Sequence, residues 1–340
     1  MYSYNKDDQP HGAVTYGADE VKLLVKNSFH DGFSVEDVDQ IDPQKKSFID
    51  DTRKIVIDNA APYGHIITTW IYLLLKELEA FKGPTTVLLY KSPDTRHMRL
   101  EHSSNVSEYL YERLTEKGYK VVYIDSRKFY INNFTTFLTP ISIPMGRLDV
   151  VSEFLSEGLD YSKEPTEKIY LSRAKTTTYN GNQKTYISDD LDITKANIQN
   201  IRSENMYMFS DRIDDEKALE EYLKELGFTV IYPEDIESYK DQLQLFASSK
   251  IVVSITSSAL SLCLVMAPNT ALVELITPMY VYADSQGNLK KDQMEYHPHY
   301  KDISTIKNKI YVGISNKYHK TSDVIDAIES NPSLKALLSS

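Results

Sequence analysis

Three consecutive hydroxyl side chains follow a short apolar run in the second half of the chain. Ile251–Ser254 is rich in β-branched residues, as expected of a buried strand, and Thr256, Ser257 and Ser258 come directly after it. The apolar segment Ala259–Met266 then predicts a helix. The first N–H groups of a helix are unpaired and lie at the positive end of its dipole, so such a turn suits a phosphate. The alternative is that the serines only cap a core helix.

Two arginines stand near this turn in the predicted topology. Arg173 ends the apolar run Lys168–Ser172, where it is placed to make bidentate hydrogen bonds to a diphosphate. Arg212 precedes an acidic helix start and either binds phosphate or pairs with those acids. Glu274 lies near the end of the next apolar run and either accepts hydrogen bonds from ribose or sugar hydroxyls or is a buried, internally satisfied glutamate. Together with the hydroxyl turn, these residues form a donor set for a nucleotide-diphosphate compound.

His65 is the candidate general base. It follows Gly64 and opens the apolar segment His65–Phe81, which predicts a largely buried helix. A helix N-terminus lowers the pKa of an imidazole and so favours the neutral form that can take a proton from an attacking hydroxyl. A histidine that merely caps a core helix is the competing interpretation.

Other catalytic patterns are absent from the sequence. There is no glycine-rich dinucleotide or P-loop motif and no nucleophile elbow, and Cys263 is the single cysteine, which excludes cysteine-cluster zinc sites. His297 and His299 are separated by a proline and have no third ligand nearby, so a loop is the better interpretation. No metal site is predicted.

Composition points to a soluble globular protein in a reducing compartment. The chain has 340 residues, 41% of them hydrophobic and 26% charged, and the N-terminus lacks the basic and apolar regions of a signal peptide. No apolar run approaches the length of a membrane span, and one cysteine excludes an intrachain disulfide. The net charge of −11 argues against a general polyanion binder. We therefore expect a cytoplasmic protein.

Apolar runs alternate with amphipathic segments through most of the chain, which predicts an α/β fold with parallel sheets. Residues 1–50 carry no usable motif and are interpreted as an extension. A polar, proline-containing stretch at Gly158–Glu167 is the expected domain boundary. The predicted strands are Lys54–Asp58, Thr85–Tyr90, Lys120–Ile124, Lys168–Ser172, Phe228–Tyr232, Ile251–Ser254, Ala271–Leu275 and Lys309–Gly313, and the predicted helices are His65–Phe81, Asn105–Lys117, Arg147–Glu157, Asp211–Gly227, Ser238–Ser248, Ala259–Met266 and Ser322–Leu338.

The order of these residues resembles that of glycosyltransferase family 61. The resemblance rests on a helix-opening histidine in Pro62-Tyr63-Gly64-His65, on a strand ending in arginine at Ile169–Arg173, and on the acidic helix start Arg212–Glu216. It continues through the segment from Gly227 into the hydroxyl turn and the strand with Glu274, and covers about residues 54–315. The chain departs from the family in having Thr256-Ser257-Ser258 where His-Gly-Ala is common, and in a longer segment between the two arginines.

This resemblance implies a GT-B architecture, two Rossmann-like domains facing across a cleft, and an inverting transfer of sugar from a nucleotide sugar. The implied organisation is an extension at 1–50, an acceptor-side domain at 51–160, a nucleotide-sugar domain at 161–320, and a C-terminal helix at 321–340 that packs back on the first domain. The donor, a UDP-sugar, would be held by Arg173, Arg212, Thr256, Ser257, Ser258 and Glu274. His65 would be the base, with Asp94 or Asp58 as substitutes, and no metal or other cofactor would be obligatory.

The acceptor is less defined by the sequence. A saccharide hydroxyl is the first choice. The second is hydroxymethylated cytosine in phage DNA, because basic residues on the acceptor side, including Arg96 and Arg99 near Asp94, offer contacts to phosphates. With either acceptor, the cytoplasm of a bacterium or of a phage-infected host is the expected location. A third hypothesis, from another class, is a non-catalytic nucleotide- or carbohydrate-binding relative, which the departure in the hydroxyl turn supports.

Overall fold

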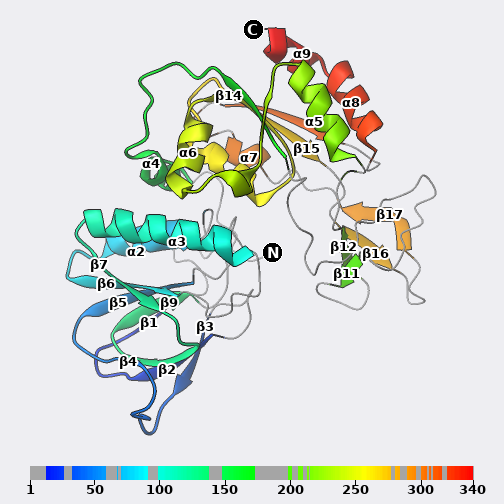
Figure 1. The fold of residues 1–340 in the computed structure, drawn as a ribbon. Helices are drawn as coiled ribbons and strands as arrows, with labels where there is room; N and C mark the ends of the chain where they lie inside the picture. Colours follow the sequence, from blue (N-terminus) through cyan, green and yellow to red (C-terminus); the bar gives the residue numbers. More distant parts are fainter. Residues whose placement is uncertain are drawn as a thin grey trace. The chain divides into compact units, whose positions relative to one another are not determined.

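The chain divides into two compact units, Met1–Phe154 and Leu155–Ser340, and each is built around its own sheet (Figure 1). The sequence predicted the boundary at residue 160. The computed structural model describes residues 13–26, 33–58, 67, 70–90, 99–137, 148–172, 198–200, 206–209, 213, 215–276, 280–283, 289–295, 300–304, 306–307, 309–315 and 320–339.

The first unit contains a five-stranded sheet in the order β1-β9-β5-β6-β7. The strands β5 (Arg53–Asp58), β6 (Thr85–Tyr90), β7 (Lys120–Ile124) and β9 (Phe134–Phe137) are parallel, and β1 (Ala13–Tyr16) joins the edge antiparallel to β9. Numbered along the chain, the parallel strands follow the order 3-2-1-4 of a dinucleotide-binding half. The switch point of this sheet lies between β5 and β9.

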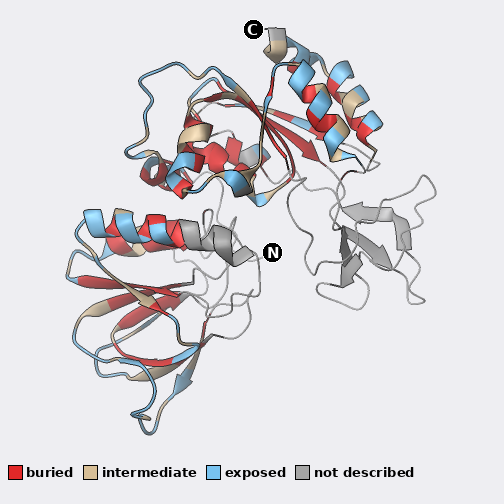
Figure 2. Ribbon diagram, viewed as in Figure 1, coloured by how far each residue is buried: buried red, intermediate tan, exposed pale blue. Residues whose placement is uncertain are grey.

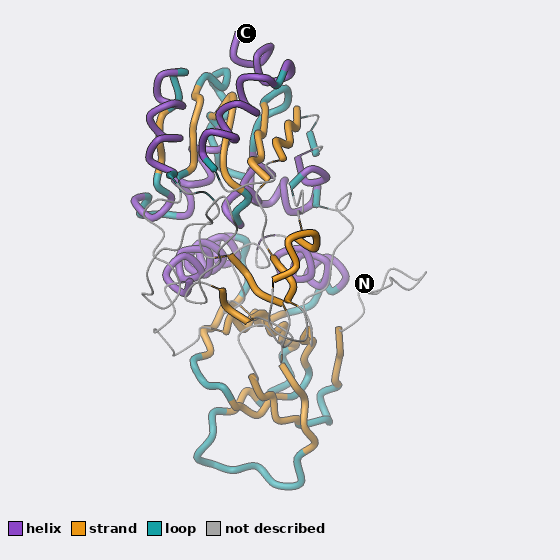
Figure 3. Tube along the Cα trace, turned by 90° about the vertical axis from the view of Figure 1, so that its right-hand side faces the viewer, coloured by secondary structure: helices purple, strands orange, loops and turns teal. Residues whose placement is uncertain are grey.

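The two faces of this sheet are covered differently. The helices α2 (Ile71–Ala80) and α3 (Arg99–Glu116) lie on one face, and a second sheet lies on the other (Figure 3). That second sheet contains β2 (Lys22–Lys26), β3 (Phe33–Asp37), β4 (Ser47–Phe48) and β8 (Lys128–Ile131) in the order β3-β2-β8-β4. The core between the sheets is formed by Leu24, Phe33, Val56, Leu88, Tyr90, Ile124, Phe129, Ile131 and Phe134.

The region expected as an N-terminal extension therefore supplies strands to both sheets of the first unit. Four strands lie between residues 13 and 48. Sequence reasoning missed them because they are short and because β2 and β3 have charged residues at their ends. Leu24 and Phe33 are buried only in the core where the two sheets pack together. A pure Rossmann-like interpretation would have placed helices on that face.

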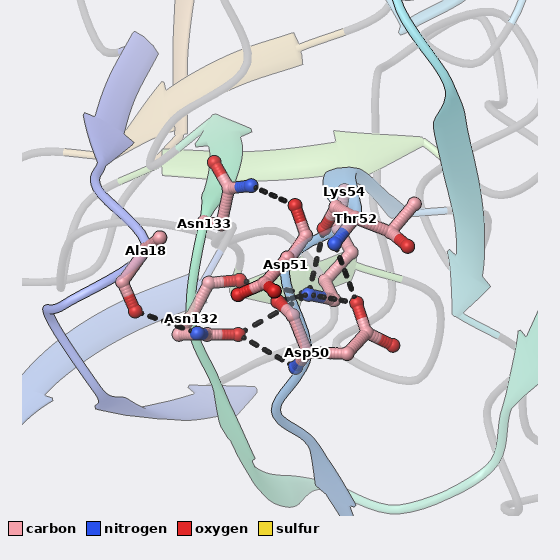
Figure 4. A network of polar contacts seen from close by, with 7 residues as sticks. All are labelled: Ala18, Asp50, Asp51, Thr52, Lys54, Asn132 and Asn133. Carbon is pink, nitrogen blue, oxygen red and sulfur yellow. Dashed lines mark hydrogen bonds and ion pairs between the residues drawn. The ribbon is translucent and has the colours of Figure 1, made fainter.

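A buried lysine joins the loops at the amino end of the first sheet (Figure 4). The Lys54 side chain, at the start of β5, is 2% exposed. Its Nζ donates to the carbonyl oxygens of Asp50 at 2.8 Å and Thr52 at 2.7 Å, and to the Oδ1 and carbonyl oxygen of Asn132 at 3.2 and 3.3 Å. It also lies 2.8 Å from the Asp50 carboxylate and lowers the pKa of that group.

The same network reaches the loop after β1. The Asn132 side chain donates to the Ala18 carbonyl at 2.6 Å, and the Asn133 side chain donates to the Asp51 carbonyl at 2.8 Å. Asn133 adopts a positive φ of 46°, a conformation that asparagine tolerates better than most residues. One ammonium group therefore ties together three loops that the two sheets share.

The second unit contains a fully parallel five-stranded sheet in the order β13-β10-β14-β15-β18. The strands are β10 (Glu167–Leu171), β13 (Thr229–Ile231), β14 (Ser249–Ile255), β15 (Ala271–Ile276) and β18 (Ile310–Ser315). In chain order this is 2-1-3-4-5, the flavodoxin-like doubly wound arrangement. The switch point lies between β10 and β14.

Helices cover both faces of this sheet, whose central strands are buried (Figures 1 and 2). On one face α5 (Glu216–Glu225), α8 (Thr321–Ser330) and α9 (Pro332–Ser339) cover a core that contains Leu219, Leu223, Val253, Val273, Val312, Val324, Ile328 and Leu334. The remaining helical segments are α4 (Asp149–Ser156), η4 (Pro233–Asp235), α6 (Tyr239–Ala247), η5 (Ser258–Val265) and α7 (Lys301–Ser304), of which η5 contacts α6 and α7.

Two features of the C-terminal segment differ from the expected single helix that returns to the first domain. The helix is divided at Asn331–Pro332, because proline has no N–H to continue the hydrogen-bonding pattern. Leu334 of the second helix is 2% exposed and lies in the core of the second unit. Residues 321–339 therefore complete the doubly wound layer of that unit.

The long insertions after β10 and β15 form a separate four-stranded sheet. It contains β11 (Ile198–Asn200), β12 (Met206–Phe209), β16 (Tyr280–Ala283) and β17 (Leu289–Glu295), and every pairing in it is antiparallel. Sequence reasoning did not predict this sheet, because β12 and β16 belong to insertions that follow different strands. Their pairing is a long-range contact that no local pattern specifies.

Most regular elements agree with the sequence predictions. The strands Thr85–Tyr90 and Lys120–Ile124 have the predicted bounds, and Gly118 and Gly227 end their helices with φ of 85° and 84°, as expected of left-handed stops. The helix predicted at Ala259–Met266 is a 3-10 helix that spans Ser258–Val265. Within the described residues, no helix has the length and apolar character needed to cross a membrane.

We predict that Lys54→Met lowers the free energy of unfolding by about 3 kcal/mol, because it leaves the two buried oxygens of Asn132 and the part-buried carbonyl oxygens of Asp50 and Thr52 without this donor. Chemical denaturation of the variant measures the loss. Lys46→Met is the matched control, because Lys46 pairs with Asp125 at 3.0 Å on the surface, where ion pairs contribute about 0–1 kcal/mol. Equal stability of the two variants would contradict a structural role for the Lys54 network.

The lowered pKa of Lys309 leads us to predict that the stability of the protein depends on pH. Lys309 is 7% exposed, and burial lowers the pKa of its ammonium from the ordinary 10.5 to about 8. Between these values the unfolded chain binds more protons than the folded one, so the contribution of Lys309 to stability rises with pH through this window. Urea denaturation at pH 7 and pH 10 should show the stability of the wild type increasing relative to Lys309→Met. A difference that does not change with pH would contradict the prediction.

Candidate functional site

The switch point of the second unit is the position where a ligand is expected. From β10 the chain passes to β13 on one side, whereas from β14 it passes to β15 on the other. Connections that leave in opposite directions open a crevice outside the carboxyl ends of the two central strands. Ser172 follows β10 and Thr256 follows β14, so two of the segments that the sequence singled out meet at this place.

The hydroxyl turn presents two side chains that have no hydrogen-bond partner among the described residues. Ser257 is the N-cap of η5, with extended φ and ψ of −150° and 156°, yet its side chain makes no capping hydrogen bond. Ser258 is exposed. Within the described part of the chain, neither hydroxyl has a hydrogen-bond partner. The alternative that these serines serve only as helix caps is therefore not supported by the geometry.

Thr256 is held in place by a hydrogen bond to Glu274. Its Oγ1 donates to Glu274 Oε1 at 2.9 Å, and its N–H donates to the Leu275 carbonyl at 3.1 Å. Glu274 is fully buried in the middle of β15, and its Oε2 accepts from the Tyr311 hydroxyl at 2.7 Å and from the Tyr300 N–H at 3.4 Å. Two predicted donor-binding residues are thus brought together. In this arrangement Glu274 fixes the start of the hydroxyl turn through Thr256.

Gly313 leaves the space in which the Tyr311 side chain reaches the Glu274 carboxylate. In the register of the sheet, Gly313 on β18 lies directly opposite Glu274 on β15. A Cβ at Gly313 would lie 3.0 Å from the Tyr311 hydroxyl oxygen and 3.1 Å from the Cδ1 of Ile276. These distances are shorter than ordinary van der Waals contact. The missing side chain therefore leaves room for the phenol that satisfies the buried carboxylate.

On the other side of the switch point, two carboxylates of α5 converge on the end of β10. Glu220 is 4% exposed and accepts from the Ser172 hydroxyl at 2.6 Å and from the Tyr232 hydroxyl at 2.9 Å. Glu216 accepts from the Tyr170 hydroxyl at 2.9 Å and from the Ser172 hydroxyl at 3.3 Å. Because Glu220 accepts the phenolic hydrogen bond, the pKa of Tyr232 is raised.

Sequence reasoning did not identify Glu220. The available signal was its spacing of four residues from Glu216, which puts both carboxylates on one side of α5, next to the buried Leu219 and Leu223. A glutamate among core leucines is unusual unless it has a partner. The hydroxyl partners come from the ends of β10 and β13, so only the folded structure reveals them.

The start of α5 is capped as the sequence predicted. The Asp215 side chain accepts from the Ala218 N–H at 3.0 Å, and its backbone N–H and carbonyl are both bonded to the Thr321 hydroxyl at 3.1 and 2.8 Å. The cap and the start of α8 are therefore fixed together at the carboxyl end of the sheet. This contact positions the helix that carries Glu216 and Glu220.

Several predicted site residues lie outside the described residues. These are His65, Asp94, Arg96, Arg173 and Arg212, together with His297 and His299. Arg99 is the first residue of α3 and Asp58 the last residue of β5, and the structure describes only the backbone of both. Their assigned roles stay predictions.

The described residues contain neither a metal-binding group of side chains nor a reactive cysteine. Among them there is no group of three or more His, Cys, Asp or Glu residues that would bind a metal ion. Cys263 is fully buried in η5, and burial raises the pKa of its thiol to about 12. With this raised pKa the thiol is protonated. Because the thiolate is the nucleophilic form, Cys263 is not a nucleophile and packs as an apolar side chain.

We predict that Tyr311→Phe lowers the free energy of unfolding by about 2 kcal/mol, because it removes a hydrogen-bond donor from the buried Glu274 carboxylate. Thermal or chemical denaturation measures the loss. Tyr111→Phe serves as the control, because Tyr111 is 38% exposed and its ring stacks on Tyr123 without needing its hydroxyl. A Tyr311→Phe variant as stable as this control would remove the assigned role of Tyr311.

Comparison with known proteins places the chain in a family. No curated protein matches it. The model of the family described as Glycosyltransferase 61 matches residues 52–273, well over half of the chain. The match extends from the start of β5 in the first unit to β15 in the second, and it includes both switch points, Glu220 and the hydroxyl turn. The chain therefore belongs to glycosyltransferase family 61 and is a glycosyltransferase.

Proposed function

We propose that the protein is an inverting glycosyltransferase of the GT-B type, which transfers a sugar from a UDP-sugar to a hydroxyl of a saccharide acceptor. Family membership supports transfer of a sugar, which requires a donor and an acceptor. The strand order of each unit supports two nucleotide-binding-type domains, as GT-B enzymes have. The donor is assigned to the second unit and the acceptor to the first.

The observation that carries the donor assignment is the pair of hydroxyls at the switch point that bond to none of the residues the structure describes. Ser257 and Ser258 lie at the N-terminal end of η5, beside the carboxyl ends of β10 and β14. There the N–H groups at the very start of the helical turn and two hydroxyl donors can together bind the oxygen atoms of a diphosphate. Glu274 contributes indirectly in this proposal, by holding Thr256 at the start of the turn.

Two arginines complete the proposed diphosphate site. Arg173 follows Ser172 directly, and Arg212 lies three residues before the cap of α5. As the bond to the anomeric carbon breaks, negative charge develops on the leaving diphosphate, and guanidinium groups and helical N–H groups stabilise that charge. With these donors in place, the reaction needs no obligatory metal ion.

His65 is the proposed general base. It lies shortly after the end of β5, which borders the switch point of the first unit. In an inverting transfer, the base takes the proton from the acceptor hydroxyl while its oxygen attacks the anomeric carbon on the face opposite the diphosphate. Asp94, Arg96 and Arg99 follow the neighbouring strand β6 and are proposed to contact the acceptor.

A saccharide is favoured over DNA as the acceptor by the net charge of −11, which opposes binding of a polyanion. A mobility-shift assay with duplex DNA containing hydroxymethylcytosine, beside a panel of oligosaccharide acceptors, separates the two. Salt-dependent binding to that DNA together with transfer to it would replace the saccharide assignment.

We predict that UDP and UDP-sugars raise the melting temperature of the wild-type protein, because they bind the folded chain alone. Arg173→Ala should lose this shift, because it removes a bidentate donor to the diphosphate. Arg127→Ala is the control, since Arg127 is an exposed arginine of the first unit. A full shift in Arg173→Ala, or no shift in the wild type with any nucleotide sugar, would contradict the donor site.

His65→Ala should keep the UDP-sugar thermal shift and lose transfer by about a hundredfold or more, because general base catalysis contributes roughly 10²–10⁴ to the rate. Product formation with the best acceptor, compared at saturating donor, measures the effect. Transfer within about twofold of the wild-type rate would assign the base to another residue.

A further inference from the structure

We propose that Glu220 is a positioning residue of the donor site, whose buried carboxylate fixes the end of β10 next to Arg173. The inference rests on the proposed function, because it assigns to Glu220 a role in binding the nucleotide diphosphate. Glu220 acts through Ser172 and does not itself touch the ligand.

The contacts of Glu220 join two neighbouring strand ends to α5. One carboxylate oxygen accepts from the Ser172 hydroxyl at 2.6 Å and the other from the Tyr232 hydroxyl at 2.9 Å. Ser172 follows β10 directly and Tyr232 follows β13 directly. One side chain of α5 therefore holds both residues at the point where the chain leaves the sheet.

The end of β10 is also held from its two neighbouring strands. The Ser172 N–H donates to the Ile231 carbonyl at 2.9 Å, and the Ser254 hydroxyl of β14 donates to the Leu171 carbonyl at 2.9 Å. These bonds fix the backbone, whereas the bond to Glu220 fixes the side chain of Ser172. The residue before Arg173 thus has its N–H and its hydroxyl both engaged.

Burying the Glu220 carboxylate costs free energy unless hydrogen bonds satisfy its oxygen atoms. Glu220 is 4% exposed and Ser172 is fully buried. Glu216 carries a second carboxylate four residues away, and like charges at this spacing repel. A buried carboxylate is tolerated when hydrogen bonds satisfy it, and an apolar side chain of similar size often gives equal or higher stability. Stability alone does not explain a glutamate here, but a requirement to fix Ser172 does.

The position of Ser172 matters because Arg173 is the next residue in the chain. A guanidinium makes two parallel hydrogen bonds to a phosphate only from a narrow range of positions. A displacement of about 1 Å in a site can cost up to about a hundredfold in activity. Glu220 holds the Ser172 side chain in addition to the bonds that hold its backbone. It therefore further restrains the last residue before Arg173 and affects donor binding without contacting the donor.

The test compares Glu220→Ala and Glu220→Gln with Glu221→Ala, an exposed glutamate at the next position of α5. Calorimetry with UDP and steady-state kinetics with a UDP-sugar are the measurements. Glu220→Ala should raise the dissociation constant for UDP and the donor KM about tenfold, with a smaller change in kcat. Glu220→Gln should restore binding to within about threefold, because each hydroxyl can turn to donate to or accept from the amide. Glu221→Ala should behave as the wild type.

A double-mutant cycle tests whether Glu220 acts through Ser172. Ser172→Ala should weaken UDP binding in the same direction, and the double variant should bind no more weakly than Glu220→Ala alone. Binding is measured per folded molecule, at a temperature where circular dichroism shows each variant to be native. If Glu220→Ala does not fold, the comparison of Glu220→Gln, Ser172→Ala and their combination carries the test.

Three outcomes would overturn the proposal. Wild-type affinity in folded Glu220→Ala would make the residue purely structural. Loss of binding in Glu220→Gln equal to that in Glu220→Ala would show that donor binding needs the negative charge and not the hydrogen bond to Ser172. If the effects of Glu220→Ala and Ser172→Ala on UDP binding were fully additive, Glu220 would not act through Ser172. Failure of the wild type to bind any nucleotide would instead contradict the proposed function, so the two failures are distinguishable.

Discussion

Buried carboxylates that accept hydrogen bonds from hydroxyl groups fix both sides of the switch point in the second unit. Glu220 holds Ser172 after β10, and Glu274 holds Thr256 after β14. The two strands are neighbours, and their connections leave in opposite directions, so these two residues lie at the switch point, where doubly wound sheets generally bind their ligands. Everything proposed about donor binding depends on their fixed positions. Neither carboxylate needs to touch the donor for that dependence to hold.

The remaining layers of each unit serve to position its sheet. In the second unit, α5 and α8 are joined through the Asp215 cap and Thr321, which sets α5 against the end of β10. In the first unit, the Lys54 ammonium joins the loops at the amino end of the sheet and leaves the carboxyl end for the predicted acceptor residues (Figure 4). Polar groups buried deep in the protein thus organise the ends of the strands, whereas apolar packing forms their centres.

The sequence predicted the central strands well because they are buried on both sides and form continuous apolar runs, as in Thr85–Tyr90. It also predicted the acidic start of α5, which Asp215 caps. It placed the strand before Arg173 near the strand before the hydroxyl turn, and β10 and β14 are indeed neighbours. It missed the four strands β1 to β4 and the sheet formed by β11, β12, β16 and β17, because most of their partners are distant in the chain. Glu220 was missed for the same reason, since its significance lies in hydroxyls from two other strand ends.

The most direct measurement of the central claim is a crystal structure with uridine diphosphate bound. We predict the diphosphate at the carboxyl ends of β10 and β14, within hydrogen-bonding distance of the Ser257 or Ser258 hydroxyl, with Glu220 still bonded to Ser172. Uridine diphosphate bound elsewhere in the chain, with the turn at Thr256–Ser258 making no contact to it, would contradict the account.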